Sequence, residues 1–198
     1  MRYQFLVDTY ESEITKTLSV WSMFRDDDLA VRPHPSDTRG RNLREHMLHQ
    51  CISEDLWFKR MFGIAVVENP LPSTESRAGF MAAYAGAAAL RLIALNAKPE
   101  AWWEEETAFF DVLRTRLWIM TRRLNHSAHH RGQQTTLLRT LRQPLHSTYG
   151  PTADTGGLMV NQAPTIYAYP DLAAILLGGD KTPLPGPGAI PSTERPAA

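Results

Sequence analysis

The chain has 198 residues, of which 43% are hydrophobic and 21% are charged, as is typical of a globular protein with a normal core. Lys plus Arg equals Asp plus Glu at 21 each, so the net charge gives no indication of binding to nucleic acid or to an anionic membrane. The single cysteine, Cys51, excludes an internal disulfide, and no apolar leader follows the charged N-terminal residues. We therefore expect a cytoplasmic protein.

The first three helices are predicted from apolar residues that recur every three or four positions. The first is expected over residues 4–24. The second is expected over residues 42–62, with Asn42 as its N-cap and Glu45 three residues later. The third is expected over residues 73–98, where many alanines give a strong helix propensity.

The fourth predicted helix is the longest, over residues 111–142, with Asp111 as its N-cap. Before it, residues 102–106 are expected to form a short extended piece or a loop. After it the composition changes, because residues 145–198 hold eight of the fourteen prolines. One short helix is predicted there over residues 170–177, with Pro170 at its first position.

Four helices and no convincing strand predict an all-α fold, a four-helix bundle with an irregular Pro-rich C-terminal tail. We expect residues 1–144 to form the bundle. Residues 145–181 are expected to form an irregular tail packed on it, and residues 182–198 are expected to be disordered.

The most informative residues for function are two histidines on the fourth predicted helix. His126 and His130 are four residues apart and so lie about 40° apart on a helix, the spacing by which one helix offers two imidazoles to one metal ion. His129 falls on a polar arc of the same helix. The apolar residues that share the stripe of the pair are Ile119, Leu137 and Leu141.

A third ligand must come from elsewhere, and the second predicted helix offers His46 and His49. Both lie at the edge of its apolar arc, and the helical wheel slightly favours His46. The alternative is that the histidine pair of the fourth helix is structural or belongs to a solvated face. Spacing alone does not decide between these interpretations.

Three strings of residues resemble the DinB-like (YfiT-like) family of metalloenzymes. Residues 126–133, HSAHHRGQ, are similar to the family signature H-x-x-H-H-R-G-Q. Residues 42–49, NLREHMLH, followed by Glu54 and Trp57, are similar to its second-helix motif, and residues 31–35 resemble its loop between helices one and two. The resemblance covers about residues 5–155 and implies a four-helix bundle with a divalent metal ion held by three histidines.

Carried over residue by residue, the resemblance implies the ligands His49, His126 and His130, with zinc or nickel as the metal. It overrides the preference of the wheel for His46, which is kept as a residue that supports or substitutes for a ligand. Gln133 and Tyr149 are further candidates near the site. The alternative for Gln133 is a buried polar residue that caps the core, and Tyr149 lies in a turn after the fourth helix that could approach the mouth of the site. No catalytic residue is assigned.

Known relatives include thiol-dependent transferases and isomerases, so the resemblance implies a metal-dependent enzyme that activates a low-molecular-weight thiol. Its partners would be that thiol and an electrophilic small molecule, with no nucleic acid and no membrane. The alternative is a non-catalytic metal-binding bundle with a stress-related or partner-binding role, for which a homodimer is considered. Cys51 is predicted to be a core residue and not a nucleophile.

Two charged residues fall on inward arcs, Glu54 on the second predicted helix and Arg131 on the fourth. Because an unpaired buried charge is very costly, we predict that they form an ion pair with each other. The alternative is that each side chain reaches solvent.

Overall fold

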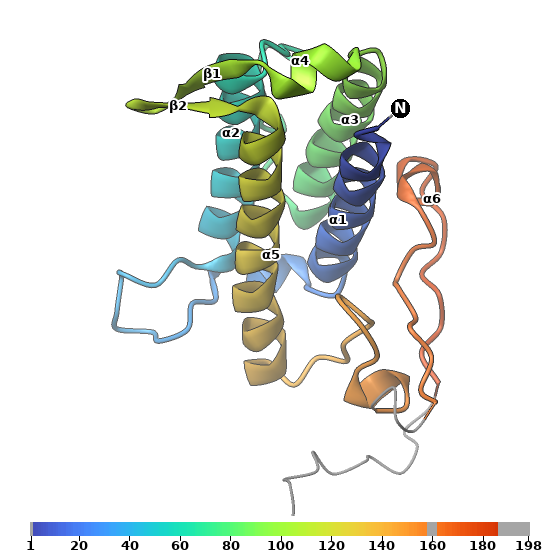
Figure 1. The fold of residues 1–198 in the computed structure, drawn as a ribbon. Coiled ribbons are helices and arrows are strands. Elements are labelled where there is room, and N and C mark those ends of the chain that lie inside the picture. Colours follow the sequence, from blue (N-terminus) through green and yellow to red (C-terminus); the bar gives the residue numbers. More distant parts are fainter. Residues whose placement is uncertain (1, 158–161, 186–198) are drawn as a thin grey trace, which may run out of the picture.

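A computed structural model describes residues 2–157 and 162–185 of the chain (Figure 1). The expected four-helix bundle is confirmed. Its long helices are α1 (Gln4–Ser22), α2 (Leu43–Met61), α3 (Arg77–Asn96) and α5 (Arg116–Thr140). The short helical segments are η1 (Asp26–Ala30), α4 (Glu100–Glu104), η2 (Ala153–Thr155) and α6 (Leu172–Leu176).

The N-terminus of α2 is fixed by the capping residues that the sequence predicted. The Asn42 side chain accepts a hydrogen bond from the Glu45 amide at 2.8 Å, and the Glu45 carboxylate accepts one from the Asn42 amide at 2.7 Å. This reciprocal cap satisfies two backbone donors and sets where the helix begins. Helix α3 begins at Arg77 instead of near residue 73, because the Ser76 hydroxyl caps it.

The predicted start of the fourth helix is wrong by five residues. Helix α5 begins at Arg116, with Thr115 as the N-cap, and Asp111 lies in the turn of a β-hairpin. The strands are β1 (Glu106–Phe109) and β2 (Val112–Thr115). Five of the ten residues 106–115 are β-branched or aromatic, which favours strands over a helix. The expected extended piece at 102–106 is instead helical up to residue 104, at the end of α4.

The hairpin projects from one end of the bundle beyond α2 (Figure 1). Its strands pair antiparallel, with Glu106 opposite Thr115 and Phe109 opposite Val112. Phe110 in the turn has a φ of 55°, a left-handed conformation that is strained for a bulky residue, and its side chain is 70% exposed. The hairpin therefore holds an aromatic side chain in solvent at a backbone cost.

A buried charge cluster lies between the helices, centred on the fully buried Glu54 of α2. Its carboxylate accepts hydrogen bonds from the Tyr10 hydroxyl at 2.6 Å and the Tyr84 hydroxyl at 2.7 Å. It also accepts from the Arg91 guanidinium at 3.1 Å and the Arg123 guanidinium at 2.9 Å. Burial alone would raise the pKa of Glu54, but Arg123, Arg91 and the hydroxyls hold it below its ordinary value.

The predicted ion pair between Glu54 and Arg131 is therefore wrong. Both side chains are buried and paired, as the cost of an unpaired charge requires, but with other partners. Arg131 pairs with Glu13 of α1, to which Lys16 also binds at 3.0 Å. Glu13 becomes the partner of Arg131 because α1 packs against α5. The periodicity of α2 and α5 alone does not predict this contact.

Helix α3 is the one helix among the described residues that is long and apolar enough, by length and composition, to cross a membrane. One such helix is weak evidence of a membrane span, since the core helices of globular folds pass the same test. In this fold α3 packs along α1, and its Arg91 is buried in the charge cluster. These contacts are those of a core helix.

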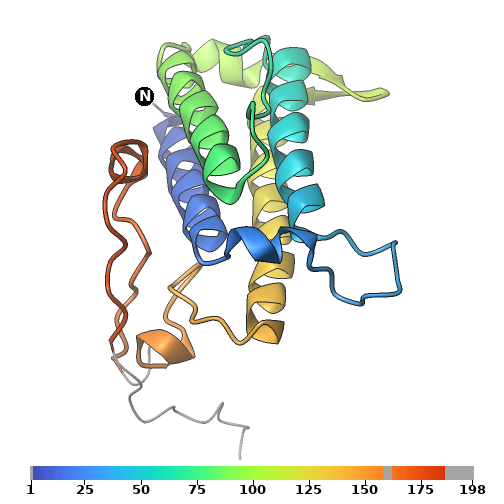
Figure 2. The same ribbon diagram turned by 180° about the vertical axis from the view of Figure 1, so that it is seen from behind.

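The segment after α5 lies along α1 and α3, on the side of the bundle away from α2 (Figure 2). The Ala168 amide donates to the Ser19 hydroxyl of α1 at 3.0 Å, and Tyr169 is buried. The predicted short helix is present as α6, but Asp171 caps it, so Pro170 lies outside the helix and not at its first position. Of the expected disordered stretch 182–198, residues 186–198 lie outside the described part of the chain.

Candidate metal centre

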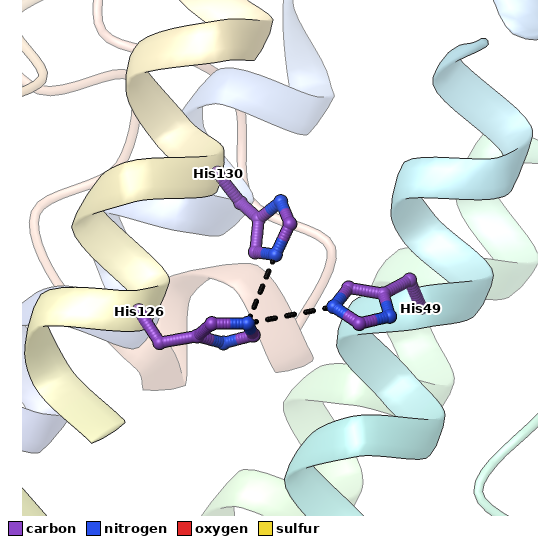
Figure 3. Close-up of side chains that lie close together, drawn as sticks. All are labelled: His49, His126 and His130. Atoms are coloured by element: carbon purple, nitrogen blue, oxygen red, sulfur yellow. Dashed lines mark hydrogen bonds between the residues drawn. The ribbon is translucent and has the colours of Figure 1, made fainter. Parts of the chain in front are cut away.

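Three histidines converge between α2 and α5 (Figure 3). The Nε2 atom of His126 lies 3.1 Å from Nε2 of His130 and 3.5 Å from Nε2 of His49. The nitrogens that each residue offers all lie within 4.8 Å of one another. Ligand nitrogens about 2.1 Å from a tetrahedral ion are about 3.4 Å apart, so the spacing suits one ion shared by three imidazoles.

The two helices run antiparallel, and each contributes one stripe to the contact. On α2 the stripe is His49, Ser53 and Trp57, each four residues from the next. It faces His130, His126 and Arg123 of α5 through ring contacts and a hydrogen bond from Arg123 to the Ser53 hydroxyl. The packing of α2 against α5 therefore determines which histidine of α2 reaches the pair on α5.

His49, and not the wheel's preference His46, joins the pair. His46 is buried beside the cluster, with its ring centroid 5.5 Å from that of His130. His129 is exposed, as its polar arc predicted, although its ring lies 5.2 Å from the ring of His130. His46 and His129 thus lie beside the cluster without belonging to the three nitrogens that converge.

The three clustered imidazoles are held in their neutral form. Burial is the main reason that the pKa of His130 falls to about 3, and the neighbouring His126 and His49 add to the effect. Burial, followed by the charge of Arg123, lowers the pKa of His126 to about 4, and burial and Arg41 lower that of His49. Neutral imidazole is the form that binds a metal ion, so the donors are prepared for one at neutral pH.

A cleft of about 420 Å³ leads to the cluster from solvent. The residues that line it are all basic or imidazole side chains: Arg41, His49, Arg122, His126, His129 and His130. Arg41, Arg122 and His129 are exposed, which places the opening at the surface. The arrangement offers three nitrogens at the base of a cleft that a small molecule can enter.

The sequence profile of the DinB family matches residues 6–156, which include the histidine cluster and all of the four long helices except the first two residues of α1. This chain belongs to the DinB family. A crystal structure of a DinB-like protein from Bacillus cereus ATCC 10987 superposes with a TM-score of 0.65 and 18% sequence identity, over 73% of this chain and 95% of that one. That likeness concerns the fold alone. No curated protein matches the chain significantly.

In this DinB-family bundle, His126 also contacts Trp57 and Arg123. The Trp57 ring stacks on the imidazole, with centroids 5.8 Å apart and planes 20° apart, and covers one face of the ring. The Arg123 guanidinium lies 3.3 Å from Nδ1 of His126 and also binds Glu54. The site is therefore joined directly to the buried charge cluster.

The contact with Arg123 selects one tautomer of His126. A guanidinium can only donate, so Nδ1 of His126 accepts and the ring proton sits on Nε2, the nitrogen that faces the other histidines. A metal-bound histidine usually donates its outer N–H to an acceptor. The donor set and its spacing fit a divalent ion. The outer nitrogen of His126, however, faces a cation, and that of His130 is buried without a hydrogen-bond partner among the described residues.

Two DinB-family site candidates from the sequence do not line the cleft. Gln133 is exposed on α5. Tyr149 is 87% exposed, and its ring lies 5.9 Å from the Lys16 ammonium of α1. The buried glutamine is the next residue, Gln134, which donates to the Gln50 side chain at 2.7 Å.

Sequence reasoning also missed Arg123 as a neighbour of the histidine cluster. The spacing along the helix predicts this contact, because Arg123 lies three residues before His126 and so shares its side of the helix.

Proposed function

We propose that this DinB-family protein is a cytoplasmic metal-dependent transferase or isomerase that activates a low-molecular-weight thiol. The observation that carries the proposal is the convergence of three neutral imidazole nitrogens at the base of a cleft open to solvent. Among the described residues, no Cys, Asp or Glu joins the three histidines as a fourth donor. A three-donor set of this kind leaves a position for an exogenous ligand, which is typical of catalytic rather than structural sites.

His49, His126 and His130 would hold one divalent ion, with zinc or nickel expected. When bound, such an ion supplies a positive centre that lowers the pKa of a water or thiol beside it. The chain itself supplies geometry: α5 fixes two imidazoles one turn apart, α2 brings the third, and the Trp57 ring stacks on His126. These residues bind and orient; none of them is assigned a covalent role.

The nucleophile must come from outside the protein, because its one cysteine does not serve. Cys51 is buried in the core, and burial, followed by the nearby Glu54, raises the pKa of its thiol to about 12. A thiol with so high a pKa stays protonated at neutral pH, and the thiolate is the reactive form. A cofactor thiol that enters the cleft is neither buried in the core nor subject to the raised pKa of the Cys51 thiol.

The reaction class follows from thiol chemistry. In a transfer, the thiol loses its proton, a carbon–sulfur bond forms at an electrophilic carbon of the substrate, and the bond to the leaving group breaks with its electron pair. In an isomerisation, the same carbon–sulfur bond forms and later breaks, which returns the thiol. Both reactions need a thiolate and an electrophile to meet in the cleft, which has room for a small molecule.

Metal analysis followed by a thiol screen tests the proposal. We expect one divalent ion per chain, and a cobalt-substituted protein whose visible spectrum changes when a cofactor thiol is added. Thiol-dependent consumption of an electrophile should be lost in His126→Ala and retained in His129→Ala, because only His126 belongs to the donor set. A spectrum that no thiol changes would contradict the thiol mechanism.

A second candidate function, a non-catalytic metal-binding bundle with a partner-binding role, is favoured by one observation. The hairpin and the start of α5 expose large apolar side chains: Phe110 at 70%, Leu113 at 59% and Trp118 at 42%. Exposed apolar clusters often mark protein–protein contacts, including those of homodimers. Light scattering of the wild type and of Leu113→Ser tests this function, which predicts a dimer that the substitution weakens.

A further inference from the structure

The cleft above the histidines carries positive charge from two arginines that are not among the three metal donors. Arg41 comes directly before the N-cap of α2, and Arg122 lies one turn before His126 on α5. Both side chains are exposed and line the cleft. They therefore bring two positive charges to its mouth, one from the segment just before α2 and one from α5.

Both arginines line the same cleft as His49, His126 and His130. Two cations and a site for a third therefore share one opening.

The two arginines lack close acidic partners in the described part of the chain, although, after the hydrogen bond from the Asn42 backbone, the charge of Arg41 is one of the causes that lower the pKa of Glu45. Neither forms an ion pair with a described residue, and no carboxylate lines the cleft. The nearest carboxylates along α2 are already engaged. Glu45 binds Arg32 and caps its own helix, and Glu54 is sealed in the buried cluster.

We propose that the cleft binds an anionic small molecule, with a carboxylate held between Arg41 and Arg122 while its thiol reaches the histidines. The inference deepens the proposed function and rests on it, because it names the charge of the thiol. A divalent ion together with two guanidinium groups places four formal positive charges around one opening. A carboxylate offsets part of that charge, and guanidinium groups bind carboxylates through paired, charge-assisted hydrogen bonds.

A series of three thiols with the same two-carbon spacer tests the charge directly. These are 3-mercaptopropionate, 2-mercaptoethanol and cysteamine, which carry a carboxylate, a neutral hydroxyl and an ammonium group. Each is titrated into the cobalt-loaded protein, and its dissociation constant is read from the visible spectrum. The comparison is made between protein variants for each thiol, so that differences in intrinsic thiol acidity cancel.

In the double variant Arg41→Gln, Arg122→Gln we expect the affinity for 3-mercaptopropionate to fall about tenfold, as for a lost charged hydrogen bond near the surface. The affinity for 2-mercaptoethanol should change by less than about twofold, and cysteamine should bind more tightly because cation repulsion is removed. Arg60→Gln is the control, since Arg60 is an exposed arginine on α2 that lies outside the cleft. Circular dichroism confirms that each variant is folded.

Cobalt affinity in the absence of any thiol provides a second readout with the opposite sign. Removing Arg41 and Arg122 should tighten the binding of the ion alone by a few-fold, because two neighbouring cations no longer repel it. The same variant thus binds metal better and the anionic thiol worse. A merely destabilised protein would lose both.

The outcomes separate this inference from the proposed function. If no thiol changes the cobalt spectrum, the thiol mechanism fails, and calorimetry with propionate then decides the anion site alone. Propionate binding that weakens in the double variant supports the inference. An equal loss for 3-mercaptopropionate and 2-mercaptoethanol, or propionate binding that does not depend on the two arginines, overturns it.

Discussion

Two polar clusters lie side by side on α2 and α5 and differ in how their charges are balanced. Around Glu54 every carboxylate oxygen has two donors, and the side chains are sealed from solvent. In the histidine cleft the imidazole nitrogens face one another, and the two arginines at the mouth have no described partner. Arg123 belongs to both clusters.

The difference indicates a structural role for one cluster and a binding role for the other. A buried charge that is fully paired contributes little that a well-packed apolar core would not, but its partners become dependent on it. Convergent donors without partners cost stability and are retained where a ligand completes them. The predictions that follow disturb the two clusters separately.

The largest effect is expected for Glu54→Gln. A neutral amide cannot balance Arg91 and Arg123, which are both buried, so the free energy of unfolding should fall by roughly 3–5 kcal/mol. Urea denaturation of the metal-free protein measures it. Asp37→Asn, which breaks an exposed ion pair with Arg39, should leave the midpoint almost unchanged. A midpoint for Glu54→Gln equal to that of the control would contradict the structural role of the cluster.

The next effect concerns the cleft and is seen in binding and not in folding. His126→Ala removes the imidazole that contacts both other donors, so the affinity for zinc should fall by more than about 100-fold, since changes outside the ligand shell already cost up to that much. Competition with a chromophoric chelator measures it. His129→Ala is the control; an equal loss in the control would mean that the donors are wrongly assigned.

A smaller effect is expected in the pH dependence of the metal-free protein. An unfolded histidine takes up a proton near pH 6.5, whereas folded His126 and His130 do so only near pH 4 and pH 3. Between these values the unfolded state binds more protons, so stability should be level above about pH 7 and fall as the pH drops from about 6.5 toward 4. The slope between pH 6.5 and 5, above the usual carboxylate range, should be shallower in His130→Gln.

The same pKa shifts alter the expected release of the metal. Because the ligands must be neutral, a bound ion is expected to leave as they become protonated. Burial of His126 and His130 lowers the pH at which protons compete with the ion. Zinc should therefore be retained to a lower pH than at a site of exposed histidines, which dialysis at a series of pH values followed by metal analysis can measure.

The smallest effect is expected at the hairpin, whose Phe109 and Phe110 contact the Trp57 ring that stacks on His126. Phe110→Asn relieves a left-handed backbone that Asn tolerates but gives up the ring contact with Phe109 at 4.8 Å. The two contributions oppose each other, so the stability should change by less than about 1 kcal/mol. Phe109→Asn should cost more, because Phe109 packs against both Trp57 and Trp118. Equal thermal melting curves for the two variants would argue against this account.

Local periodicity predicted the four long helices and placed His126 and His130 on one face of the fourth. His126 and His130 share a stripe because of a spacing within one helix, which no packing partner can change. The choice between His46 and His49 depended on how α2 packs against α5, which the wheel does not contain. Here the family resemblance favoured His49, and the structure brings that residue to the pair.

Failures of the sequence predictions came from contacts between helices. The partner of Glu54 is on α3 as well as α5, and the partner of Arg131 is on α1. Gln133 was expected beside the histidines, but the C-terminal half of α5 turns its buried face toward α1, where the Trp21 indole donates to Gln134. Asp111 looked like a helix cap because the strand signal of the ten residues around it was overlooked.

The hydrogen bond from Arg123 to His126 has a consequence for proton stoichiometry. In the metal-free protein it places the ring proton of His126 on Nε2, where an ion would have to bind. If loading breaks this hydrogen bond, the proton moves to Nδ1 and none is released from His126. If the guanidinium stays in place, the ring must become an imidazolate and one proton enters the buffer. Calorimetry in buffers of different ionisation enthalpy counts that proton, and Arg123→Met, which cannot donate, should bring the count to zero.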